Sequence, residues 1–131
     1  MVDYEAYRSY HAVNLESQTH SASQVELVLV LFDGLLEEIA RARGHIEQRR
    51  YEQKGDSISK CINILNGLSS ALDFEAGGDV VTNLARLYDY CAHKLYQASI
   101  ELDAEALAEA ESLIVKLKGG WVGVRDQHAE A

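Results

Sequence analysis

The chain has 131 residues, of which 47% are hydrophobic and 25% charged, a balance typical of one folded domain and unlike that of a disordered chain. Its formal net charge of −9 argues against nucleic acids and anionic membrane surfaces as partners, because proteins bind both through Lys and Arg. It has nine glycines but no proline, the strongest helix breaker, which favours an all-α fold with long helices.

Two features of the sequence, the polar N-terminus and the spacing of the cysteines, favour a cytoplasmic protein. Residues Met1–Glu5 are acidic and polar, unlike a secretory signal, and the apolar run Leu27–Phe32 is far too short for membrane insertion. Cys61 and Cys91 lie in amphipathic helical patterns without CxxC spacing, so we expect buried free thiols in a reducing compartment. A disulfide would need their Cα atoms within about 7 Å, which spacing along the chain does not decide.

The first long helical pattern begins at Ser23. Ser23 and Glu26 have the spacing of a capping box, in which both side chains bond to free amides at a helix start. The basic turn Gln48–Arg50 suits a helix end, where the macrodipole is negative. Between them, apolar residues recur at steps of three and four, as on a helix face buried in a bundle: Val28, Phe32, Leu35, Ile39, Ala42 and Ile46.

Three further helices follow by the same criterion. We expect the second to begin near Asp56 or Ser57, and Gly77-Gly78 to break the pattern before a third helix capped by Asp79. A shorter fourth helix follows Asp103 and ends at Gly119-Gly120. The third helix carries the most regular heptad: Val81, Leu84, Tyr88, Cys91, Leu95, Ala98 and Leu102.

Short connections make sequential helices antiparallel, so the fold class is all-α, an up-down four-helix bundle with a short N-terminal capping segment. We divide the chain into the capping segment (1–22), the bundle (23–121) and a frayed C-terminal tail (122–131). In the capping segment, Tyr4, Tyr7, Tyr10 and His11 share one helical face, and we expect it to dock loosely on the bundle.

The expected helices carry more apolar residues than a bundle core needs. Such residues either widen the core or contact the capping segment, or they form a groove for an amphipathic partner segment. We expect the surplus residues to be more exposed than Phe32, Leu65 and Leu95, or to be covered only by the capping segment. With Tyr7 and Tyr10, they are the candidate client-binding residues: Leu29, Leu36, Ile64, Leu68, Leu87 and Tyr90.

The sequence offers no catalytic, cofactor or metal site, so we do not expect an enzyme. A di-iron bundle uses Glu-x-x-His motifs, and none of the five histidines has an acidic residue three positions earlier. Phosphate-binding glycine loops and the G-x-S-x-G motif are also missing from the sequence. We interpret Asp89 with His93 as a local helix pair, and Glu37 with Glu38 as surface charges.

Four local patterns carry a resemblance to a known family. They are Ala6-Tyr7-x-x-Tyr10; the stretch from Ala22-Ser23 to Phe32-Asp33-Gly34; Gly77-Gly78 with Asn83-Leu84-x-x-Leu87-Tyr88-x-Tyr90; and Leu113, Leu117 and Trp121. In this order they cover nearly the whole chain and resemble the FliS family of flagellin export chaperones. The chain departs from the family pattern at Gln24, where the family usually has proline, and at Phe32, where it usually has tyrosine.

The resemblance implies a cytoplasmic chaperone for type III protein export during flagellum assembly. Its partners would be the disordered C-terminal segment of flagellin, which it keeps from premature polymerisation, and the flagellar export apparatus, to which it presents the client. Two alternatives stay open from the residues alone. One is a structural homo-oligomeric bundle, in which the extra apolar rows form the interface between subunits; a weak homodimer is the smallest such assembly. The other is an adaptor that binds another amphipathic helix.

Overall fold

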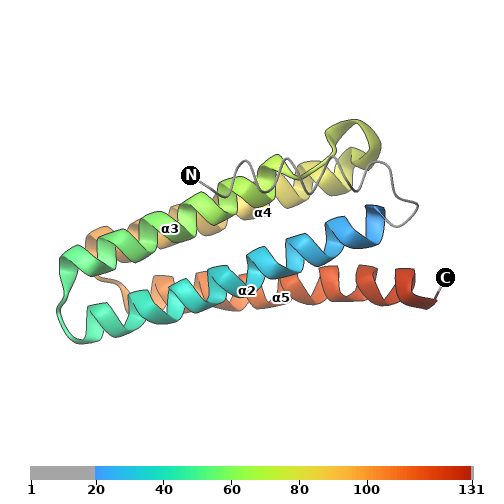
Figure 1. Ribbon diagram of the computed structural model, residues 1–131. Helices are drawn as coiled ribbons and strands as arrows, with labels where there is room; N and C mark the ends of the chain where they lie inside the picture. The colour runs from blue at the N-terminus through green and yellow to red at the C-terminus, as the bar shows by residue number, and fades with distance from the viewer. Residues whose placement is uncertain (1–19, 131) are drawn as a thin grey trace.

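The computed structural model describes residues 20–130, which form four helices (Figure 1). Helix α2 comprises His20–Glu47, α3 Tyr51–Ser70, α4 Phe74–Glu101 and α5 Ala104–Glu130. Connections of two or three residues join them, so each helix runs antiparallel to the one before it. The predicted all-α, up-down four-helix bundle is confirmed.

The four helices are arranged in a ring in chain order. Helix α2 packs on α3, α3 on α4, α4 on α5, and α5 returns to α2, while the backbones of the diagonal pairs stay apart and their core side chains meet at the centre (Figure 1). The bundle therefore has four edges, each the line where two neighbouring helices meet. The α2–α3 edge lies opposite the α4–α5 edge.

The core is a continuous set of apolar side chains, one row from each helix. Phe32, Leu65 and Leu95 are at most 1% exposed, as their place in the heptads predicts. The Phe32 ring meets the Tyr88 ring edge to face, with centroids 6.2 Å apart. The Tyr88 hydroxyl is a hydrogen-bond acceptor for Trp121 Nε1 at 3.0 Å, which satisfies both polar atoms near the core.

The first two helices start at other residues than predicted. Helix α2 begins at His20, so Ser23 lies within it and the predicted capping box is wrong. Helix α3 begins at Tyr51, several residues before Asp56, because Arg49 takes a left-handed φ of 59° and completes the turn directly after α2. Gly55 is then helical, and its low helix propensity costs only about 1 kcal/mol, which tertiary packing offsets.

Helix α4 is interrupted at the glycine pair, but it starts before it. Asp73 is the N-cap, and its Oδ1 accepts hydrogen bonds from the amides of Glu75 and Ala76 at 3.1 and 3.2 Å. Gly78 has φ 55° and ψ −135°, a conformation that L-residues rarely adopt. Asp79 therefore begins only the second stretch of α4 and does not cap the helix.

Helix α5 starts as predicted after Asp103, whose Oδ1 accepts from the amides of Glu105 and Ala106 at 3.0 and 3.1 Å. The expected stop at Gly119-Gly120 is wrong, because the helix continues to Glu130 through the expected tail. Glycine lowers helix propensity without forcing an end. On either side of the pair, Lys118 and Trp121 bond to other helices and hold α5 in place.

Both cysteines are buried free thiols, as predicted. Burial raises the pKa of Cys61 to about 12, with a further contribution from the negative charge of Glu38. Burial likewise raises the pKa of Cys91 to about 11. None of the four helices is long and apolar enough to cross a membrane over the residues described.

The glycine interruption of α4 can be tested by substitution. Gly78→Ala should destabilise the protein by about 1–3 kcal/mol, because alanine must adopt a positive φ. The control is Gly44→Ala in the last turn of α2, where a Cβ atom meets no neighbour; it should stabilise by up to about 0.5–1 kcal/mol. Urea unfolding measures both, and a Gly78→Ala protein as stable as wild type would show that α4 passes through Gly78 without a kink.

The buried thiols give a second prediction. In the folded protein Cys61 and Cys91 should react with an aromatic disulfide reagent at pH 8 only as fast as the protein opens, because both are buried and mostly protonated. A matched control, Ser59→Cys at an exposed position of α3, should react at once. Rapid labelling of either native thiol in wild type would contradict the packing described.

Candidate client-binding site

The six predicted client-binding residues within the described chain differ widely in exposure. Leu87 and Tyr90 are 36% and 45% exposed, as expected for a binding surface. Leu36 and Ile64 are half-buried beside the core. Leu68, at 1%, belongs to the core cluster, so its expected place outside the core is wrong, whereas Leu29 is 5% exposed but does not belong to that cluster.

The misplaced residue shows how wide the buried stripe of α3 is. Leu68 lies one helical turn after Leu65 and belongs to the core cluster itself, because α3 has helices packed on two sides. Tyr7 and Tyr10 lie outside the described residues, so their role stays a prediction.

The predicted residues do not form one groove, because they lie along three different edges. Ile64 approaches Gly34 of α2 and therefore lies at the α2–α3 edge. Leu36 is one turn after Asp33, which bonds to α5, so it lies at the α2–α5 edge. Leu87 is one turn before Tyr90, which bonds to α5 and places both at the α4–α5 edge.

The exposed apolar residues of the α4–α5 edge form a row along α4, which we call the α4 row. It consists of Val80, Leu87 and Tyr90, spaced by seven and three residues so that they share one face of the helix. Val80 is 67% exposed. Three large side chains without a covering helix are typical of an interaction surface.

The α4 row ends at a polar cluster that joins α4 to α5. The Tyr90 hydroxyl donates to Glu109 Oε2 at 2.6 Å, and Lys94 Nζ forms an ion pair with the same oxygen at 3.1 Å. The Lys94 ammonium also lies 5.6 Å from the Tyr90 ring centroid, within range of a cation–π contact. Tyr90 is thus held against α5 by its hydroxyl and leaves its ring partly exposed.

These contacts shift the ionisation of all three groups. The hydrogen bond from Tyr90, and then that from Lys94, lower the pKa of the Glu109 carboxyl. The bond to Glu109 in turn raises the pKa of the Tyr90 phenol and of the Lys94 ammonium. Because the folded pKa of Glu109 is depressed, the cluster is complete above the carboxyl's unfolded pKa and is lost as pH falls through the folded value.

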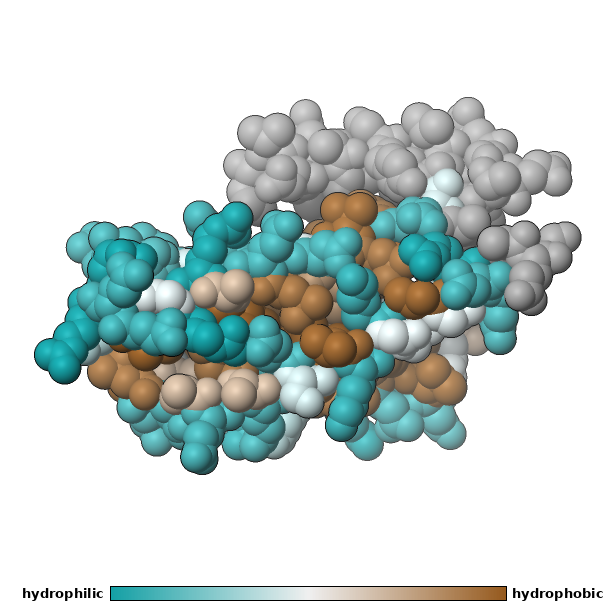
Figure 2. Space-filling view, turned by 90° about the horizontal axis from the view of Figure 1, so that it is seen from below, coloured by the Kyte–Doolittle hydropathy of each residue, from teal (hydrophilic) through white to brown (hydrophobic). Residues whose placement is uncertain are grey.

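A second partly apolar surface lies along the α2–α5 edge. Figure 2 shows a band of apolar residues along this face between polar ones. Two ion pairs cross the edge, Lys118 to Asp33 and Arg43 to Glu111, each 2.6 Å long. Val115, 52% exposed, lies between Glu111 and Lys118 on α5 and belongs to this edge.

Sequence reasoning missed several exposed apolar residues. They share positions away from the core heptad, a signal that could have found them: Val30, Tyr96, Ile100 and Val115. Within the described part of the chain, no group of His, Cys, Asp or Glu side chains is arranged to hold a metal ion.

Comparisons with known proteins identify the family. The family model described as "Flagellar protein FliS" matches residues 6–128. The chain belongs to the FliS family. It is 43% identical over 115 residues to the flagellar secretion chaperone FliS of Salmonella typhimurium, covering 87% of this chain and 85% of that protein.

More distant FliS relatives match over a similar length. The chain is 38% identical over 120 residues to the flagellar secretion chaperone FliSB of Pseudomonas aeruginosa, covering 92% of this chain and 95% of the relative. With the FliS of Bacillus subtilis it shares 29% identity over 106 residues, 81% of this chain and 78% of that one. The family matches extend across all four helices, so the bundle as a whole is the FliS unit.

The division between core and α4 row can be tested by two leucine truncations. Leu95→Ala should cost about 2–5 kcal/mol, because Leu95 is fully buried and its removal leaves a cavity. Leu87→Ala, at a half-exposed site, should cost about 1 kcal/mol. Urea unfolding that ranks the two in the opposite order would show that the α4 row is part of the core.

Proposed function

We propose that this protein is a cytoplasmic flagellar export chaperone that binds the C-terminal segment of flagellin. It keeps this segment from polymerising before export and presents it to the flagellar export apparatus. The relatives at up to 43% identity are flagellar secretion chaperones, which are not enzymes. The single observation that supports client binding is the α4 row, three large apolar side chains left exposed beside a well-packed core.

The form of the client follows from the form of this surface. Residues spaced by seven and three on one helix face suit an amphipathic segment that inserts apolar anchors at helical spacing. A segment that is disordered when free loses conformational entropy on binding, so its affinity depends on a few large anchors. The net charge of −9 favours association with basic stretches of such a client.

The decisive experiment compares two flagellins. Full-length flagellin should bind with measurable heat in isothermal titration, and flagellin lacking its C-terminal segment should not. The mass of the complex by light scattering should correspond to one chaperone and one client. Binding unaffected by the truncation would exclude the C-terminal segment as the ligand, whereas a dimer that persists in the presence of flagellin would favour the homo-oligomeric bundle.

A point variant tests the α4 row directly. Leu87→Ala should weaken flagellin binding by about tenfold, since truncating a central interface anchor typically costs more than 1 kcal/mol. The control is Val30→Ala on α2, also exposed but away from the α4 row, which should bind as wild type does. Equal affinities for all three proteins would place the client elsewhere on the bundle.

The N-terminal segment gives a further prediction, although it lies outside the described residues. Tyr7 and Tyr10 are three apart, so on a helix their rings share a face and are suited to protect an apolar surface. If the segment occupies the client surface, deletion of residues 1–17 should leave the bundle folded and speed client association in stopped-flow measurements. Affinity should rise if the segment only competes and fall if the tyrosines also contact the client; unchanged rate and affinity would exclude both roles.

A further inference from the structure

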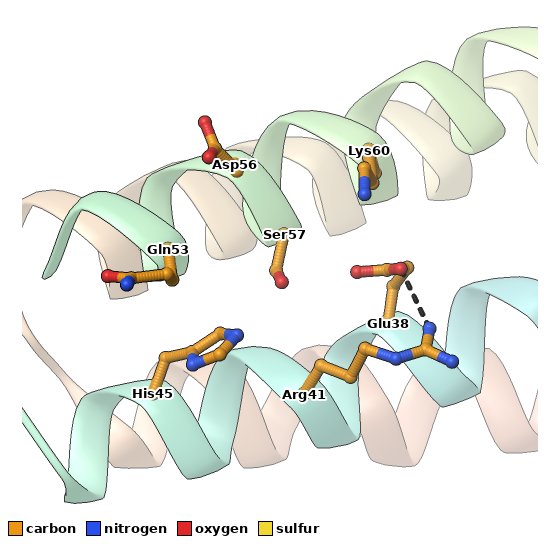
Figure 3. A pocket seen from close by; sticks show the side chains of 7 residues that line it. All are labelled: Glu38, Arg41, His45, Gln53, Asp56, Ser57 and Lys60. Atoms are coloured by element: carbon orange, nitrogen blue, oxygen red, sulfur yellow. Dashed lines mark hydrogen bonds and ion pairs between the residues drawn. The ribbon is translucent and has the colours of Figure 1, made fainter. Parts of the chain in front are cut away.

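An open polar pocket lies at the α2–α3 edge, opposite the α4 row (Figure 3). Its volume is about 470 Å³. Helix α2 contributes Glu38, Arg41 and His45, and α3 contributes Ser57 and Lys60 among others. Nothing in the proposed client binding uses these residues, since they are on the other side of the bundle.

Glu38 is the unusual member of this pocket. It is only 9% exposed, so the expectation that Glu37 and Glu38 are both surface charges is wrong for Glu38. One step along a helix turns the side chain by about 100°, which brings Glu38 toward α3 while Glu37 stays exposed. The Oε2 atom of Glu38 is buried, and no described residue donates a hydrogen bond to it. A desolvated carboxylate oxygen without a donor costs free energy, so Glu38 does not serve the stability of the bundle in this state.

The one partner of Glu38 is weakly held. Arg41 Nη1 donates to Glu38 Oε1 at 2.7 Å from the same helix, three residues later. The Arg41 side chain is 56% exposed, and exposed pairs of this spacing contribute little to stability. Arg41 thus reaches one carboxylate oxygen and leaves the other, which lies on the α3 side, without a donor.

We propose that Glu38 binds an arginine side chain of a partner protein that docks on the α2–α3 edge. When the Glu38 side chain turns toward the pocket, an entering guanidinium can donate to both carboxylate oxygens at once, the bidentate geometry that arginine favours. It replaces Arg41, which turns into solvent, so the number of cations beside Glu38 does not change. Protein atoms cover Oε2 in the free protein, so the side chain must turn before the ligand reaches this oxygen, and the hydrogen bond that Oε2 gains offsets the cost of that movement.

The rest of the pocket is compatible with a guanidinium. Ser57 and Gln53 offer neutral oxygen acceptors, and His45 Nδ1 accepts a hydrogen bond from Arg50 Nε at 3.0 Å. In Figure 3 Asp56 lies at the outer side of the pocket, where its carboxylate adds negative charge. Lys60 is an exposed residue at the rim of the pocket, so its side chain can move into solvent as the ligand enters.

The first test uses a capped pentapeptide, Ala-Ala-Arg-Ala-Ala, added to the full-length protein and followed by NMR. The backbone amides of His45 and Ser57 should shift in a saturable manner. The matched control peptide carries citrulline, which has the shape of arginine without its charge, and should produce no saturable shift. Equal shifts with both peptides, or none with either, would overturn the proposal.

Two substitutions separate a guanidinium site from other uses of the pocket. Glu38→Gln should lower the affinity of the protein for the arginine peptide by about tenfold or more, while the adjacent Glu37→Gln should leave this affinity unchanged. Arg41→Ala should strengthen binding of the arginine peptide, because it removes the competing side chain; weaker binding would show that Arg41 does not compete with the ligand and would contradict the proposal. The melting temperature of Glu38→Gln should be no lower than that of wild type, since the buried oxygen lacks a donor. A clear fall would show that Glu38 serves the fold.

The source of the arginine is tested by comparison with free arginine. The pentapeptide should bind more tightly, because a docking surface also contacts the flanking backbone. Tighter binding of free arginine would make the pocket a small-molecule site and contradict protein docking. Flagellin binding by Glu38→Gln should equal that of wild type, so failure of this proposal is distinct from failure of the proposed client site.

Discussion

Tyr88 connects three of the four helices through one side chain. Its ring meets Phe32 of α2 edge to face, and its hydroxyl accepts from the Trp121 indole of α5. Helix α4 is thereby fixed to α2 across the core and to its neighbour α5, at a level where α5 has already passed the expected end at Gly119-Gly120. The C-terminal half of α5 depends on this contact, because two adjacent glycines alone give it low helix propensity. With α5 in place, the α4–α5 edge exists over its whole length, and with it the surface that carries the α4 row.

A ring of four helices divides each helix surface into a buried stripe, two edges and an outer face. The heptad residues fill the buried stripe, and close packing in the core accounts for their burial. The edges are crossed by a few polar contacts, among them Tyr90 to Glu109 and Lys118 to Asp33, which fix the register of neighbouring helices. Exposed ion pairs contribute little to stability. Their more important effect is to leave defined stretches of apolar surface between them, and those stretches are where a client segment can be accommodated without disturbing the core.

The heptad pattern predicted the fold class and the core but neither the helix ends nor the edges. Phe32, Leu65 and Leu95 are buried as expected, because a repeat of three and four needs no knowledge of the neighbours. The start of α3 was missed because the left-handed residue that makes the turn is Arg49, a side chain without a turn signal. Leu68 was taken for surface because the width of a buried stripe depends on how many helices pack against it. That number comes from the ring arrangement, which is a property of the whole bundle.

Glu37 and Glu38 illustrate what a single sequence cannot distinguish. Both are acidic, adjacent and inside the same helix, yet one is exposed and the other buried beside Cys61, whose pKa its charge helps to raise. Since Glu38 is buried on the α3 side and the α4 row lies on the opposite edge, the two surfaces share no residue. A ligand at one edge can influence the other only through the core, and that core is closely packed and tied together at Tyr88. We therefore expect the two edges to be occupied independently, so that a chaperone loaded with its client keeps a free surface for a second protein.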